Sequence, residues 1–156
     1  MKIENLADHL GLIDTIARWH FQEWGHADPT GSVQSWAEGL RKRTNRDRIP
    51  ATFVALQDKD LLGSVTLTDH DMSSRMDLSP WLAGLYVKPE ERGHGLGSAL
   101  TNHAVEAAAQ MGVSRLYLYT ESARDLYLKL GWRSIAEDYY EGQIVTIMYF
   151  EILPEA

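Results

Sequence analysis

The 156-residue chain contains no cysteine and no surplus of basic residues. Without cysteine there is no disulfide framework, no thiol nucleophile and no cysteine-ligated metal. Lys and Arg number 15 against 22 Asp and Glu, giving a formal net charge of −7, and neither half of the chain is basic. Non-specific nucleic-acid binding is therefore not expected, because its affinity comes from basic side chains that neutralise phosphates. The acidic surplus favours cationic partners such as amines.

The sequence also lacks targeting segments, low-complexity stretches and internal repeats. No apolar run approaches the ~18 residues that span a bilayer. The first residues, Met1-Lys2-Ile3-Glu4-Asn5, carry an acid where a signal peptide has basic and then apolar residues. These absences, with the missing cysteine, predict a cytoplasmic protein with no membrane partner. One domain is expected at this length, over residues 1–156, and six scattered histidines without paired ligand spacing predict no metal site.

Hydrophobic periodicity predicts an α/β domain. Two helices are expected first, over residues 8–24 and from Ser32 to about Asn45. Strands 51–56 and 61–68 follow, and their short polar connection is typical of an antiparallel hairpin. The remaining elements are expected to be a buried strand at 81–87, a helix at 96–111, a strand at 116–119, a helix at 121–130, and strands at 132–140 and 143–152. The unit 81–119 has the βαβ order, which predicts at least one parallel pair in a mixed, mostly antiparallel sheet.

Three glycines alternate at positions 93, 95 and 97, between the buried strand and the following helix. Such a loop can turn successive amides into one concavity beside a positive helix N-terminus, which suits a phosphate or pyrophosphate. Arg92 can add a charge-assisted hydrogen bond, and His94 can assist it. A P-loop is excluded because no Gly-Lys-Ser/Thr is present, and a Rossmann turn is excluded by the G-x-G-x-G spacing. On the glycines alone, a simple glycine-rich turn is the alternative.

The segment Arg92-Gly93-His94-Gly95-Leu96-Gly97 matches the R/Q-x-x-G-x-G/A signature of the GNAT superfamily of N-acetyltransferases. A second segment, from Ala123 to Trp132, is similar to the A-x-x-x-Y-x-K-L-G-F segment of the family. The two motifs occur in order around the βαβ unit, so residues 85–132 carry the resemblance. It implies the acyl-CoA N-acyltransferase fold, with a mixed, mostly antiparallel sheet of six to seven strands flanked by four helices. It also implies acetyl transfer from acetyl-CoA, as co-substrate, to a primary amine of a small molecule, peptide or protein.

The resemblance also implies a set of site residues. Acetyl-CoA would lie with its pyrophosphate on the glycine loop and its pantetheine arm along the central strand, on Leu85, Tyr86, Val87, Arg92, Gly93, His94, Gly95, Leu96, Gly97 and Ser98. Tyr127 matches the general-acid tyrosine, and the Val87 backbone is the family's usual oxyanion donor. A phenol near pKa 10 can protonate a thiolate near 8.5 in a tuned site. From periodicity alone, a packed aromatic side chain on the apolar face of a short helix is the favoured interpretation of Tyr127.

The general base departs from the family pattern, because Trp81-Leu82-Ala83-Gly84 offers no acid where many members carry a strand Glu. The candidates that stay open are Glu23, His26, Asp69, His70, Asp71 and Asp77. A site without a dedicated carboxylate suits a low-pKa amine, since neutralising a lysine-type amine at pH 7 costs roughly 4.6 kcal/mol. Residues expected to contact the acceptor are Trp24, Asp69, His70 and Trp81. Core packing is the alternative for the two tryptophans, and an ordinary solvated loop for the other two.

Direct transfer in a ternary complex is expected, since no cysteine can carry the acetyl group. A catalytically idle acyl-CoA-binding or regulatory domain on the same scaffold is the main rival. The missing strand Glu favours this rival, and Tyr127 argues against it. An acyl group longer than acetyl is a third alternative, and a homodimer is compatible with the resemblance.

Overall fold

The computed structural model describes residues 1–152, which form one seven-stranded sheet in the order β1-β2-β3-β4-β5-β7-β6. All neighbouring strands are antiparallel except β4 and β5, which confirms the predicted mixed, mostly antiparallel sheet. The strands are β1 (Lys2–Asn5), β2 (Ala51–Gln57), β3 (Asp60–Thr68), β4 (Trp81–Val87), β5 (Arg115–Thr120), β6 (Arg133–Tyr140) and β7 (Gln143–Glu151). The sequence does not predict β1, because four residues are too few to establish an alternating pattern.

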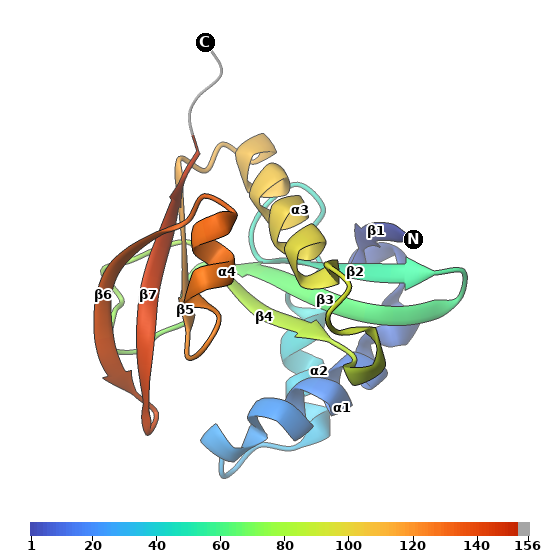
Figure 1. The fold of residues 1–156 in the computed structure, drawn as a ribbon. Helices are drawn as coiled ribbons and strands as arrows, with labels where there is room; N and C mark the ends of the chain where they lie inside the picture. The colour runs from blue at the N-terminus through green and yellow to red at the C-terminus, as the bar shows by residue number, and fades with distance from the viewer. Residues whose placement is uncertain (153–156) are drawn as a thin grey trace.

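Four α-helices lie in residues 1–152: α1 (Ile13–Trp24), α2 (Val33–Arg41), α3 (Leu96–Gln110) and α4 (Arg124–Lys129). In Figure 1, α1 and α2 lie below strands β2 to β4, and α3 lies above them. The first helix begins later than predicted, because residues 6–8 and 10–12 form separate 3₁₀ turns. The cap predicted at Ser32 is present, since the Ser32 and Ser35 side chains each bond the backbone amide of the other.

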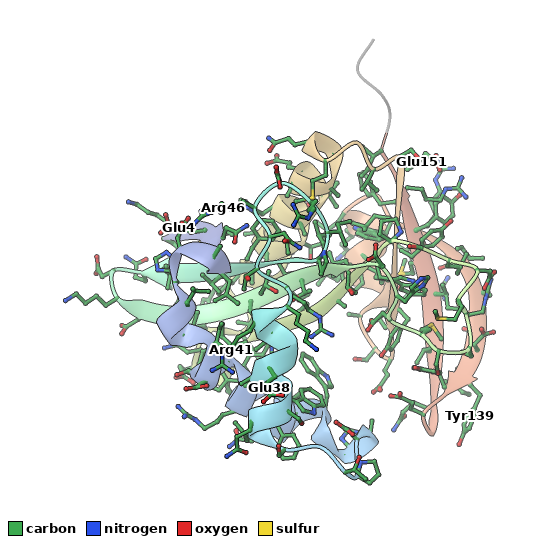
Figure 2. All side chains as sticks on the ribbon, turned by 180° about the vertical axis from the view of Figure 1, so that it is seen from behind. Glu4, Glu38, Arg41, Arg46, Tyr139 and Glu151 are labelled. Atoms are coloured by element: carbon green, nitrogen blue, oxygen red, sulfur yellow. The ribbon has the colours of Figure 1, made fainter. Side chains whose placement is uncertain are left out.

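The sequence places its apolar side chains on both faces of the sheet, so each layer of helices covers a separate core. On α2, Ala37 and Leu40 are buried against α1 and the sheet, whereas Glu38 and Arg41 point outward, as Figure 2 shows. On the opposite face, Leu100 and other apolar residues of α3 pack on the second core. Burial of these two faces stabilises the central strands from both sides.

The strands β4 and β5 part soon after they begin, because only Trp81 and Tyr117 are paired between them. On its other edge, β4 contains one extra residue relative to β3, between Ala83 and Tyr86. Gly84 lies in this bulge with φ of 59°, a backbone conformation that favours glycine. A bulge bends and twists its strand. The end of β4 is therefore left with an edge that faces no strand, as the resemblance implies (Figure 1).

Candidate active site

A cleft of 950 Å³ lies where β4 and β5 part. Residues 82–85 of β4 and 118–120 of β5 contribute to its lining, together with α1 and α2 on one side and the β6–β7 turn on another. The volume is within the range of small-molecule sites, which hold ligands in cavities of roughly 300–1,000 Å³. Elements distant in the sequence thus meet around one concave surface.

The glycine loop adjoins the end of β4 and leads into α3. Gly93 and Gly95 have φ of 84° and 83°, and a Cβ added at either would meet no atom within 4 Å. No hydrogen-bond acceptor for the amides of residues 93–98 is found in the described part of the chain, and α3 has no side-chain cap at its N-terminus. Free amides at the start of a 15-residue helix attract anions. The loop therefore fits the pyrophosphate that the resemblance implies.

Arg92 lies at the start of this loop, but its side chain turns back onto β4. The Arg92 Nε donates a hydrogen bond to the Val87 carbonyl oxygen at 2.7 Å, and its guanidinium carbon lies 5.4 Å from the centre of the Tyr86 ring. His94 is exposed, whereas the Leu96 side chain belongs to the core. Leu96 can therefore offer a ligand only its backbone amide.

Tyr127 lies on α4, lines the cleft and is 7% exposed. Its ring packs at an edge against the buried Trp132, with 6.1 Å between the ring centres. Burial raises the pKa of the Tyr127 phenol above its usual value of 10. The phenol is thus protonated at neutral pH and can donate a proton or a hydrogen bond into the cleft.

The structure separates the four residues predicted to contact an acceptor into two groups. Trp24 and His70 line the cleft. Asp69 is exposed and lies outside the lining. The prediction for Trp81 is wrong, because its side chain is fully buried and its Nε1 donates to the Leu78 carbonyl oxygen at 2.8 Å. Trp81 packs with Met72, Val145 and Ile147 in a core cluster, which is the alternative that its apolar surroundings left open.

Only some of the candidates for a general base line the cleft. Glu23, His26, His70 and Asp71 line the cleft. Asp77 instead accepts two hydrogen bonds from Arg75, each 3.1 Å long, and lies outside the lining. Burial raises the pKa of Asp71 to about 7, and the nearby Glu141 adds to this shift while Arg43 opposes it.

Sequence reasoning missed His20, a buried residue of α1 in the cleft wall. Its side chain is 6% exposed, and its Nε2 lies 3.0 Å from the Oγ of the fully buried Ser64. A Cβ added at Gly84 would be 3.6 Å from His20 Cε1, so the imidazole faces the bulge of β4. Burial lowers its pKa to about 4, which leaves it neutral at pH 7. The signal was present, because His20 follows Ile16 by four positions on the buried face of α1.

The cleft carries a negative potential. Its lining includes a single arginine, Arg43, against five carboxylate residues: Glu23, Asp28, Asp71, Glu121 and Glu141. Like charges around one concavity focus the potential and attract ligands of the opposite sign. The sign is opposite to that of the glycine loop, so the two ends of the site suit ligands of different charge.

Comparisons with known proteins agree with this geometry. The model of the Acetyltransferase (GNAT) family matches residues 13–132. A thialysine N-epsilon-acetyltransferase from Bos taurus is 39% identical over 61 residues, which are 36% of this chain and 36% of that protein. The chain therefore aligns with only about a third of the length of this curated relative.

Solved structures share the fold at low sequence identity. An aminoglycoside 6'-N-acetyltransferase complexed with coenzyme A superposes with a TM-score of 0.78 at 17% identity, over 100% of this chain and 99% of that one. Mutant forms of a spermidine/spermine N-acetyltransferase from Vibrio cholerae give 0.71 at 21% identity, over 96% and 93% of the two chains. With the family model matching most of its length, the chain belongs to the acetyltransferase (GNAT) family.

Proposed function

We propose that the protein, acting as a single domain over residues 1–156, transfers an acetyl group from acetyl-CoA to a primary amine. The two substrates meet in a ternary complex, and the acetyl group passes directly to the amine. The observation that carries this proposal is that β4 contributes residues 82–85 to the acidic cleft, ends at Val87 and leads from there into the anion-binding loop. One end fits a pyrophosphate, and the other attracts an amine.

The co-substrate supplies an acyl group activated as a thioester, and the residues of this chain hold and orient it. The amides of residues 93–98 have no acceptor of their own in residues 1–152 and would bind the pyrophosphate oxygens. The free edge of β4, at Leu85, Tyr86 and Val87, would pair with the amide groups of the pantetheine arm as an added strand would. The Val87 backbone is the candidate donor to the developing oxyanion.

Tyr127 is proposed as the general acid that protonates the departing thiolate. Its raised pKa keeps the phenol protonated until the thiolate forms. His20 is too weak a base, at a pKa of about 4, to hold the proton of the amine. It is proposed to keep the bulge of β4 in place as a neutral hydrogen-bonding group.

The Tyr127→Phe variant tests this assignment. Loss of the hydroxyl is expected to lower kcat by about 100-fold or more, the usual contribution of a general acid, with little change in the KM for acetyl-CoA. The assay follows CoA release against a panel of primary amines. Unchanged kcat would remove Tyr127 from the chemistry.

The same assay separates the rival function. Tight acetyl-CoA binding by calorimetry, with no turnover on any amine, would make the domain a binding or regulatory module. Offering propionyl- and butyryl-CoA tests the proposal of an acetyl donor against longer acyl groups.

A cytoplasmic location, a homodimer and the lack of nucleic-acid and membrane partners also belong to the proposal. The helices within residues 1–152 include none with the length and apolar composition of a membrane span.

A further inference from the structure

The loop between β3 and β4 is held firmly against the sheet. Met72 is fully buried in a core cluster, and the Ser73 amide donates to the Tyr140 hydroxyl at 3.2 Å. Arg75 pairs with Asp77 and also lies 3.7 Å from Asp138 of β6. These contacts anchor the chain just after Asp71, so Asp71, next to the buried Met72, occupies a defined position in the cleft wall.

Asp71 differs from the other acids of this region because its carboxylate has no partner. Arg75 is engaged by Asp77 and Asp138, and no hydrogen bond or ion pair of Asp71 is found in residues 1–152. A largely buried carboxylate without a partner is costly, because burial penalises its charged form. The group lines the cleft and thus faces the space that a ligand would enter.

The surroundings of Asp71 suit a cation. Glu141 and Tyr119 also line the cleft; Glu141 acts electrostatically on Asp71, and Asp71 acts electrostatically on Tyr119. The rings of Tyr119 and Tyr140 meet edge to face, with 5.5 Å between their centres. Aromatic faces beside carboxylates bind ammonium groups through cation–π attraction as well as charge. Arg43 opposes this potential but makes no ion pair with Asp71 in the described residues.

We propose that Asp71, with Glu141 and the rings of Tyr119 and Tyr140, forms a subsite for a second cationic group, so that the acceptor is a diamine or polyamine rather than the low-pKa amine that the missing strand Glu favoured. This inference rests on the proposed acetyl transfer. One amine reacts near the bulge of β4, while a second, protonated nitrogen lies on Asp71. The subsite contributes to acceptor affinity and takes no part in the chemistry.

A matched series of acceptors tests the subsite. Linear α,ω-diamines of three to eight carbons are compared with amino alcohols of equal length, which replace the second ammonium by a neutral hydroxyl. At the best-fitting length, kcat/KM for the diamine is expected to exceed that for the amino alcohol by about tenfold or more, since a charge-assisted hydrogen bond contributes ~1.5–3 kcal/mol. Equal kcat/KM at every length would overturn the subsite while leaving acetyl transfer intact.

The Asp71→Asn variant tests whether Asp71 is the source of the higher kcat/KM for diamines. It is expected to abolish the diamine advantage through KM, and to leave kcat/KM for the amino alcohols within about twofold of wild type. Asp60→Asn removes the same charge at an exposed position outside the cleft and is expected to keep the full advantage. A fall in kcat for both classes of acceptor in Asp71→Asn would overturn the proposal, because Asp71 would then act in proton transfer. No turnover with any acceptor would overturn the proposed function and the subsite with it.

Discussion

At the scale of single residues, burial in the cleft shifts the pKa of one base, His20, and one acid, Asp71, in the direction that favours the neutral form. The pKa of His20 falls to about 4, and the pKa of Asp71 rises to about 7. The main cause is the same for both, since loss of water on burial penalises the charged form of each group. His20 is satisfied by Ser64, whereas Asp71 is not satisfied by the protein. This contrast gives the two residues separate roles, one structural and one directed at a ligand.

The raised pKa of Asp71 predicts how stability depends on pH. Between the usual value of 3.8 and about 7, the folded state holds a proton that the unfolded state has lost. Stability from this group is therefore complete below pH 3.8 and is lost as pH rises through 7. The Asp71→Asn variant is expected to melt roughly 5 °C above wild type at pH 8, and close to wild type at pH 4. A lower melting temperature at pH 8 would indicate that the protein itself satisfies the carboxylate.

The lowered pKa of His20 predicts the opposite dependence of folding stability on pH, at acid pH. Its folded pKa of about 4 lies below the usual 6.5, so the unfolded state takes up the proton first. Stability from the neutral imidazole is present above pH 6.5 and is lost as pH falls through 4, by roughly 3 kcal/mol for a shift of this size. The His20→Gln variant, which keeps a partner for Ser64, is expected to flatten this acid limb in thermal unfolding. An unchanged limb would place the acid sensitivity elsewhere.

At the scale of elements, the end of β4 and the start of α3 make the site. The bulge at Gly84 turns the strand from β5, and the glycine loop leaves its amides free at the helix N-terminus. Neither feature depends on the identity of exposed side chains. The anion site is thus formed by the backbone of the loop. A substitution is expected to disturb it only where the new residue changes the φ angle.

Two glycines with nearly the same positive φ, one in the loop and one outside it, allow a matched test of the loop. Gly95 precedes α3 with φ of 83°, and Gly112 follows it with φ of 84°. Alanine at either position costs ~1 kcal/mol or more in the left-handed region, so both variants are expected to lose similar stability. Only Gly95→Ala is expected to raise the KM for acetyl-CoA, by about tenfold. Equal KM values in the two variants would show that the loop backbone does not bind the co-substrate.

At the scale of the whole molecule, local sequence patterns predicted most helices and strands, but only some of the residues that line the cleft. The apolar run 81–87 and the glycine loop are visible in the sequence, because each has a local signature. Trp81 was misplaced because an aromatic residue in a buried strand looks the same whether it faces a core or a cavity. The cluster of Asp71, Tyr119 and Tyr140 was missed because it joins a loop with β5 and β6, and only tertiary structure brings these segments together.

The central claim is that the anion-binding loop and the negative cleft together support acetyl transfer to an amine. The most direct measurement mixes the purified protein with acetyl-CoA and a primary amine, and follows free CoA thiol and acetylated amine together by mass spectrometry. Equimolar CoA and N-acetylated product, formed only when all three components are present, is the predicted result. CoA release without acetylated amine, or no release with any amine of the panel, would contradict the claim.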